Sequence, residues 1–244
     1  MIKKVDRFNV VVIYGINHKG STYNIAQELL NNFKNANVTE FFLTGDKIQF
    51  CNGCYSCIFK GEEKCPHYES LKPIIASMLE AKLIILASPC YVYDVTGQLK
   101  SFLDHLAYLW MPHRPDERMF KKIGVVISTA AGGGAKRTNK TMKKTLNFMG
   151  ISKVYSYSAN VAACSWKDVK DKKKDKVKND MISLNRKIEK LIEKDDKLKT
   201  NLFVKFIFML MRAAHKKNKD DSKDKAHWEK NGWLNGKRPW QKNN

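Results

Sequence analysis

Short apolar runs alternate with longer helical patterns along the first two thirds of the chain. Runs rich in β-branched or aromatic residues predict strands at about 8–14, 38–43, 82–88, 121–129 and 153–161. Amphipathic patterns predict helices at 21–34, 68–80, 97–110, 137–149 and from about 167. Apolar strands separated by helices indicate parallel pairing with both faces covered, because each crossover connection lays a helix on the sheet. The sequence therefore predicts an open α/β fold.

The composition suits a folded domain of this class. The 244 residues are 43% hydrophobic, which is enough for one sizeable core. The formal net charge of +21 prompts a search for phosphate-bearing partners. Basic residues exceed acidic ones both in 1–159 and in 160–244, and no nucleic-acid module is recognisable. We expect a general preference for polyanions and no specific nucleic acid.

Two features bear on the compartment. Lys3, Lys4 and Arg7 precede the apolar run "FNVVVIYGI", but no small-residue cleavage site follows, so we interpret the run as a buried strand. Four of the six cysteines fall within fifteen positions, unlike the spread framework of a disulfide-stapled secreted domain. We therefore expect a cytoplasmic protein.

Three loops follow strands at the edge where open α/β sheets bind ligands. These loops are "GINHKGST", "SPCYVYDVTG" and "STAAGGGA". In the first, Gly20, Ser21 and Thr22 lie at a helix N-terminus, where unpaired N–H groups attract a phosphate, although Ser21 could simply cap the helix. The loop matches neither the dinucleotide fingerprint nor the Walker pattern, which leaves a mononucleotide phosphate.

The second and third loops suit a flat ring. Pro89 and the backbone after it can form a ledge, with Tyr91 and Tyr93 offering aromatic faces unless they are packed at the strand end. The three glycines 132–134 would let the backbone approach a ligand closely. Together the loops predict a site for one planar, phosphorylated ligand.

These segments resemble the flavodoxin-like NAD(P)H-dependent FMN reductase family, including its iron–sulfur flavoprotein branch, over about residues 8–160. The resemblance is carried by "CNGCYSCIFKGEEKC…ASPCYVYDVTGQLKSFLDHL", together with "PHRP" and "TAAGGG". It implies a flavodoxin-like sheet of order 2-1-3-4-5 with helices on both faces. It also implies an FMN-binding domain, which we place at 1–164. From about Ser165 the composition shifts to Lys-rich helical sequence, so we expect a helical C-terminal extension at 165–244.

The resemblance also implies the residues that hold FMN. The phosphate and ribityl chain would contact His18, Gly20, Ser21, Thr22 and Asn24. The isoalloxazine ring would contact Pro89, Cys90, Tyr91, Val92 and Tyr93, and its other edge would contact Thr129, Ala130, Gly132 and Gly133. Ile16 and His18 depart from the Gly-Ser-x-Arg opening of the family.

The activity implied by the resemblance is an FMN-dependent oxidoreductase. NAD(P)H would deliver hydride to the flavin, and a small acceptor such as a free flavin or a quinone would then take the electrons. The cofactor carries this chemistry, so we expect no indispensable side-chain acid or base. We expect a homodimer or a higher homo-oligomer.

Four cysteines form a compact motif. Cys51, Cys54, Cys57 and Cys65 read C-x2-C-x2-C-x7-C, a spacing that suits a [4Fe-4S] cluster. Zinc is a second metal interpretation, although structural zinc sites usually pair two separated knuckles. Unligated thiols near the active site are the third.

The last third of the chain contains two further features. The run "NLFVKFIFMLMR" would span ~18 Å as a helix against a bilayer core of ~30 Å, so it is too short to cross. We expect a buried helix, with a dimer interface as one setting, rather than a membrane-surface helix. The ending "AHWEKNGWLNGKRPW" predicts an ordered tail that wraps a neighbour and covers the flavin site of a partner subunit.

Two other function classes remain open. One is an electron-transfer flavoprotein that exchanges single electrons with a partner, with the cysteine cluster as a relay. The other is a basic protein that binds an anionic surface without chemistry. Flavodoxin carriers tend to be acidic, so the net charge of +21 favours the oxidoreductase over the carrier.

Overall fold

The computed structural model describes residues 7–44, 48–163, 165–193, 198–219 and 222–241. A five-stranded, all-parallel sheet runs through it in the order β2-β1-β3-β4-β5, which confirms the predicted topology. The strands are β1 (Phe8–Tyr14), β2 (Ala36–Phe42), β3 (Leu83–Pro89), β4 (Ile123–Ala130) and β5 (Lys153–Asn160).

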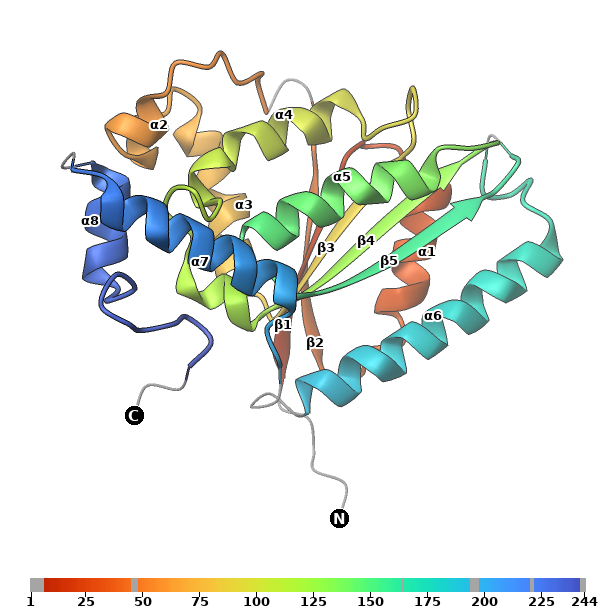
Figure 1. Ribbon diagram of the computed structural model, residues 1–244. Helices are drawn as coiled ribbons and strands as arrows, with labels where there is room; N and C mark the ends of the chain where they lie inside the picture. The colour runs from red at the N-terminus through yellow and green to blue at the C-terminus, as the bar shows by residue number, and fades with distance from the viewer. Residues whose placement is uncertain (1–6, 45–47, 164, 194–197, 220–221, 242–244) are drawn as a thin grey trace.

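Helices cover both faces of this sheet (Figure 1). Helices α1 (Ser21–Leu30) and α6 (Asp171–Ile192) lie on one face, and α3 (Tyr68–Glu80), α4 (Gly97–His105) and α5 (Ala135–Phe148) lie on the other. Strand side chains alternate between the two cores: Val11 and Ile13 face α3 and α4, whereas Val10 and Val12 face α1. The central strands β1, β3 and β4 are therefore buried on both sides, whereas the edge strands β2 and β5 are partly exposed.

Several helix ends differ from the sequence prediction. Helix α1 stops at Leu30, four residues early, and the Asn32 side chain donates a hydrogen bond of 2.6 Å to the Glu28 carbonyl. An asparagine that bonds to nearby backbone competes with helix continuation. The predicted helix 97–110 ends at His105 as α4, and Ala107–Leu109 form the separate short helix η2. Three other short elements were not predicted because a single turn shows no periodicity: α2 (Ser56–Phe59), η1 (Glu62–Lys64) and η3 (Glu117–Lys121).

Helix α6 packs on one face of the sheet. Its Val177, Met181 and Ile188 are fully buried among residues of α1 and of the central strands. The first helix of the predicted C-terminal extension therefore completes one face of the α/β layers. A division of the chain at residue 164 stays a prediction, and Cys164 lies outside the described residues.

Two more helices form a separate cluster beside α5. Helices α7 (Leu202–Lys217) and α8 (Lys223–Lys230) bury Phe208, Trp228 and Trp233 against Met111 and Phe120. The predicted order of the tail is confirmed, and its tryptophans pack on their own chain. Helix α7 is buried along one side only. Within the described residues, none of the helices combines the length and hydrophobicity needed to span a bilayer.

Candidate functional site

A cleft of about 220 Å³ opens at the carboxyl ends of β1, β3, β4 and β5. Most of the residues predicted from the three loops line it: His18, Gly20, Ser21, Thr22, Pro89, Cys90, Tyr91, Thr129 and Ala130. The fold thus brings together segments more than a hundred residues apart at one rim of the sheet.

Hydrogen bonds join the three loops directly. The hydroxyls of Thr22 and Thr129 lie 2.6 Å apart and are both buried. The backbone N–H of Cys90 donates to the Thr129 carbonyl at 2.7 Å. Since Thr129 contacts both neighbouring loops, it fixes the spacing across the cleft.

The strand ends next to the cleft are equally constrained. Thr96 Oγ1 donates to the Gly15 carbonyl at 2.5 Å, and the Thr96 N–H donates to Ser88 Oγ at 3.1 Å. A Cβ at Gly15 would lie 2.6 Å from Thr96 Oγ1, so only glycine fits there. These contacts hold the ends of β1 and β3 together beneath the ligand loops.

The first loop presents an uncapped helix N-terminus. Side chains cap α4, α7 and α8, through Thr96, Asn201 and Ser222, but no side chain among the described residues caps α1. Gly20 occupies the N-cap position of α1, so the alternative that Ser21 caps the helix is wrong. The first-turn N–H groups of α1 therefore remain available to an anion. Asn24 does not line the cleft; its amide braces the loop by donating to the Gly20 carbonyl at 2.9 Å.

The second loop is a tight turn. Tyr91 and Asp94 exchange backbone hydrogen bonds of 2.9 and 3.1 Å, and Val92 and Tyr93 between them have φ values of 50° and 62°. A β-branched residue in the left-handed region is a strained outlier, a feature that clusters at functional sites. Val92 is 98% exposed, and Tyr91 and Tyr93 are exposed as well, so the alternative that the two tyrosines are packed at the strand end is wrong. Val92 and Tyr93 do not line the cleft.

In the third loop, Gly134 is the constrained glycine. Its φ is +94°, and an added Cβ would lie 2.5 Å from Cys90 Sγ and 3.1 Å from Tyr93 Cδ1. Gly132 and Gly133 do not line the cleft, and a Cβ on either would meet nothing within 4 Å. The close approach to a ligand expected of these three glycines stays a prediction; Gly134 instead approaches Cys90 of the second loop.

The sequence prediction missed four lining residues: Ile16, Ala131, Val161 and Ala163. Val161 and Ala163 follow β5, whose carboxyl end meets the same edge of the sheet. The Val161 N–H donates to the Ala130 carbonyl at 2.8 Å, which draws this fourth loop onto the third. The strand order itself contained the signal, because β5 neighbours β4.

The four motif cysteines lie on a partly exposed segment around α2. Cys51 and Cys54 are exposed, and Cys57 and Cys65 are half-buried. Among the described residues, no three or more His, Cys, Asp or Glu side chains are arranged to hold a metal ion. Burial raises the pKa of the Cys57 and Cys65 thiols, whereas the hydrogen bond between Cys54 Sγ and Ser56 Oγ lowers the pKa of the Cys54 thiol.

Arg114, from the "PHRP" segment, anchors the cysteine segment to the body. Its guanidinium is buried and donates to the Cys57 carbonyl and, at 3.1 Å, to the Ile58 carbonyl. It also pairs with Asp224 of α8. Although burial opposes ionisation of Asp224, the hydrogen bond to His113 and the charge of Arg114 lower the pKa of that carboxyl. One arginine thus joins the cysteine segment to the C-terminal cluster.

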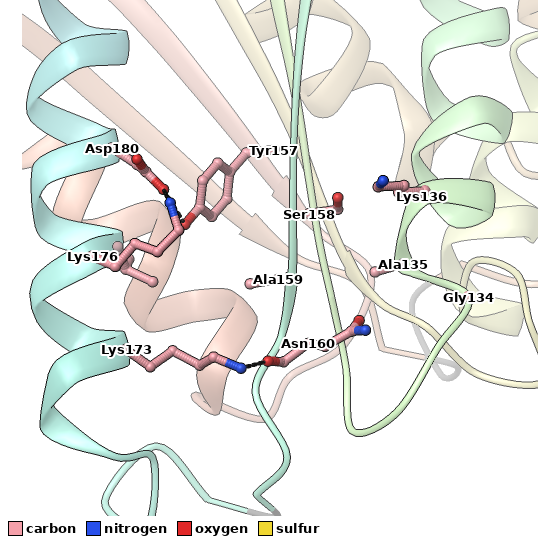
Figure 2. Close-up of a pocket in the computed structure, with 11 residues that line it drawn as sticks. Gly134, Ala135, Lys136, Tyr157, Ser158, Ala159, Asn160, Lys173, Lys176 and Asp180 are labelled. Atoms are coloured by element: carbon pink, nitrogen blue, oxygen red, sulfur yellow. Dashed lines mark hydrogen bonds and ion pairs between the residues drawn. The ribbon is translucent and has the colours of Figure 1, made fainter.

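A larger cavity, of about 520 Å³, lies outside β5 (Figure 2). Two of its three lysines are already engaged by protein groups: Lys173 donates to the Asn160 carbonyl, and Lys176 pairs with Asp180 at 3.0 Å (Figure 2). The loops after β1 and β3 contribute no residue to it. The smaller cleft, where four loops converge, is therefore the better candidate site.

Residues 8–165 match the sequence model of the NADPH-dependent FMN reductase family. The chain belongs to this family. The match ends before α6, so the family's sequence pattern covers the cleft but not helices α6 to α8.

Individual relatives agree with this membership. An iron-sulfur flavoprotein of Archaeoglobus fulgidus is 32% identical over 114 residues, which are 47% of this chain and 50% of the relative. An iron-sulfur flavoprotein of Methanocaldococcus jannaschii is 30% identical over 146 residues, or 57% and 71% of the two chains. The chain thus spans only half the length of the first of these relatives.

Solved structures share the fold at low identity. An FMN-dependent NADH-azoreductase from Bacillus anthracis, in complex with FMN, superimposes with a TM-score of 0.54 and 14% identity. The superposition covers 72% of this chain and 99% of that enzyme. At this identity the similarity concerns the fold alone, and it supports the flavodoxin-like architecture.

Proposed function

We propose that this protein is an FMN-dependent oxidoreductase that takes hydride from NAD(P)H and passes electrons to a small acceptor such as a flavin or a quinone. The observation that carries the proposal is the cleft in which the family's FMN loops converge. When bound, FMN accepts a hydride and returns electrons singly or in pairs. The protein's part is to bind, orient and shield the cofactor.

The residues of the cleft fit a phosphorylated, planar group. The uncapped N-terminus of α1 supplies backbone donors, and Ser21 and Thr22 add hydroxyls for a phosphate and ribityl chain. Pro89, Cys90 and Tyr91 supply the ledge for a flat ring, and Thr129 with Ala130 closes the opposite side. Gly132, Gly133, Val92 and Tyr93 would reach the cofactor only at the rim.

Spectroscopy tests the proposal most directly. The purified protein should show flavin absorption, or quench FMN fluorescence with one site per chain, and it should oxidise NADH or NADPH when a quinone is added. Ser21→Ala should weaken FMN binding about tenfold, since it removes a donor to a charged phosphate. Ser183→Ala, on the exposed face of α6, serves as the matched control. A protein that ignores FMN would overturn the assignment.

The iron–sulfur alternative rests on the C-x2-C-x2-C-x7-C motif and on relatives named iron-sulfur flavoproteins. In that case Cys51, Cys54, Cys57 and Cys65 would hold a [4Fe-4S] cluster, and the protein would act as an electron-transfer flavoprotein. Iron and acid-labile sulfide assays on anaerobically purified protein decide this. About four irons per chain would support the carrier, and metal-free active protein would exclude it.

The proposal includes a cytoplasmic homodimer. Tyr91, Val92 and Tyr93 are exposed at the rim of the cleft, as expected for a surface that meets another molecule. Light scattering gives the mass directly. If the rim lies in the interface, Val92→Glu should produce a monomer, whereas Val38→Glu, on the exposed edge strand β2, should not.

A further inference from the structure

Helix α7 is held firmly by its inner side. Val204 and Phe208 are fully buried in the cluster with Trp228 and Trp233. At its N-terminus, Asn201 caps the helix and donates to the Ser152 carbonyl at 2.6 Å. The orientation of α7 about its own axis is therefore fixed, and so is the set of side chains that it presents outward.

The outward side of α7 is an apolar ridge. The ridge consists of Leu202, Phe203, Phe206, Met209 and Leu210, all of them exposed, with Leu202 at 84% and Phe206 at 65%. These positions follow helical spacing and form one stripe along the helix. Contiguous exposed apolar side chains of this kind mark a binding surface. The sequence prediction of a buried helix is thus correct for only one side of α7.

The ridge adjoins a basic surface. The exposed positions of α5 are all cationic: Lys136, Arg137, Lys140, Lys143 and Lys144. Phe148 of α5 packs edge-on against Phe203 of the ridge, with ring centroids 5.7 Å apart, and Lys144 lies over the Phe148 ring. The C-terminal end of α5 lies beside the N-terminal end of α7 on the front of the molecule (Figure 1). The basic and apolar surfaces therefore form one continuous face.

This face has no counter-charge of its own. Helix α5 carries five Lys and Arg residues, α7 carries four, and neither contains Asp or Glu. Two copies meeting through this face would bring two such basic surfaces together without an acidic partner on either helix. Charge complementarity thus selects an anionic occupant and disfavours a second copy.

We propose that the α5/α7 face docks on an anionic lipid bilayer surface. The ridge inserts among the acyl chains near the headgroups, and the cations of α5 contact lipid phosphates. Helix α7 is ~24 Å long and lies flat in this arrangement, since it does not need to cross the bilayer. The ligand cleft opens at the sheet rim, away from the ridge, so the proposed oxidoreductase would work at a membrane surface.

Vesicle sedimentation with the full-length protein tests the docking. Vesicles of phosphatidylcholine mixed with phosphatidylglycerol at about two to one should bind the protein, and pure phosphatidylcholine should bind it at least about tenfold more weakly. Binding should fall as salt rises from about 50 mM to about 500 mM, because charges at the surface are screened.

Matched variants locate the surface. Phe206→Ser/Leu210→Ser should reduce the partition coefficient at least about 50-fold, since each removes a large inserted side chain. Lys140→Ser/Lys143→Ser should reduce it about 25-fold, at about fivefold per cation. Lys178→Ser/Lys187→Ser, on the exposed face of α6, removes the same charge and should change binding less than about threefold.

A depth measurement does not depend on weakened binding. Brominated lipid should quench the fluorescence of the tryptophan introduced by Phe206→Trp. It should not quench the fluorescence of Trp228 and Trp233, which are buried in the parent chain. Two results would overturn the proposal. One is no sedimentation with anionic vesicles at low salt. The other is a parent protein that is a dimer and binds no lipid, together with a monomeric Phe206→Ser/Leu210→Ser variant. That result would mean that the ridge binds a second copy of the chain.

Discussion

Gly134 offers the sharpest test of how the cleft is built. In Gly134→Ala the new Cβ would sit at a φ of +94° and 2.5 Å from Cys90 Sγ. The left-handed conformation costs an alanine about 1–2 kcal/mol. The contact with Cys90 adds about 1 kcal/mol, at the low end for overpacking because the Sγ can rotate away. We expect a loss of about 2–3 kcal/mol in the free energy of unfolding.

The same loop provides the control. Gly133→Ala places a Cβ in open space at a φ outside the left-handed region. The free energy of unfolding should therefore stay the same or rise by up to about 0.5 kcal/mol. Urea unfolding of the apoprotein, followed by far-UV circular dichroism, measures both variants. In Gly134→Ala the third loop must shift away from Cys90, so FMN affinity should also fall by about tenfold, as measured by quenching of flavin fluorescence.

A double variant separates the two contributions. Gly134→Ala/Cys90→Ala removes the contact but keeps the strained φ, so it should recover about 1 kcal/mol relative to the sum of the single variants. Equal stability of Gly134→Ala and Gly133→Ala would refute the reasoning. It would mean that the second and third loops do not touch at Gly134 in solution.

Three further changes test other contacts. Thr22→Val removes the buried hydroxyl pair with Thr129 and should cost about 1 kcal/mol of stability, as urea unfolding would show; no change would mean that the loops are not joined there. Arg114→Met leaves the largely buried Asp224 with its hydrogen bond to His113 but without the guanidinium, and should cost about 3 kcal/mol, the low end for breaking a buried pair. The drop in melting temperature should not be reproduced by Arg118→Met, because the Arg118 side chain is exposed. Burial lowers the pKa of Lys122 from 10.5 to about 8. Between these pH values the unfolded state binds more protons than the folded state, so the stability of the parent rises with pH. The difference in the free energy of unfolding between Lys122→Met and the parent should therefore shift by up to about 3 kcal/mol from pH 8 to 10.5, and a constant difference would contradict the burial of that charge.

The sheet was predictable because its information is local and repeated. The central strands are continuous apolar runs, β2 and β5 are rich in β-branched or aromatic residues, and the crossover helices show a 3.6-residue period, so none of these signals depends on distant contacts. Helix ends were less predictable, as at Asn32, because a single side-chain hydrogen bond decides them. Helix α7 shows a further limit: its composition predicts burial, but only the packing of Trp228 and Trp233 decides which side is covered.

Part of the cleft was predictable because the carboxyl ends of parallel strands meet at one edge of the sheet, where the loops bind ligands. Thr22, Pro89 and Thr129 follow from that rule. The roles of the glycines did not follow, because a run of three gives no sign of which one meets another loop. That information lies in the tertiary contact between Gly134 and Cys90, which joins residues far apart in the sequence.

The first loop lacks the arginine of the family's usual opening, so the groups that would bind an anion in the cleft have to be found elsewhere. Lys19 lies over the rings of Tyr23 and Phe42, at 5.3 and 5.7 Å, and does not line the cleft. No Lys or Arg is among the described lining residues, so a bound phosphate would rely on the N–H groups of α1 and on hydroxyls. Such short-range donors are far less sensitive to salt than surface lysines. Binding in the cleft and binding at the α5/α7 face should therefore separate cleanly in a salt titration, because only the second depends on exposed cations.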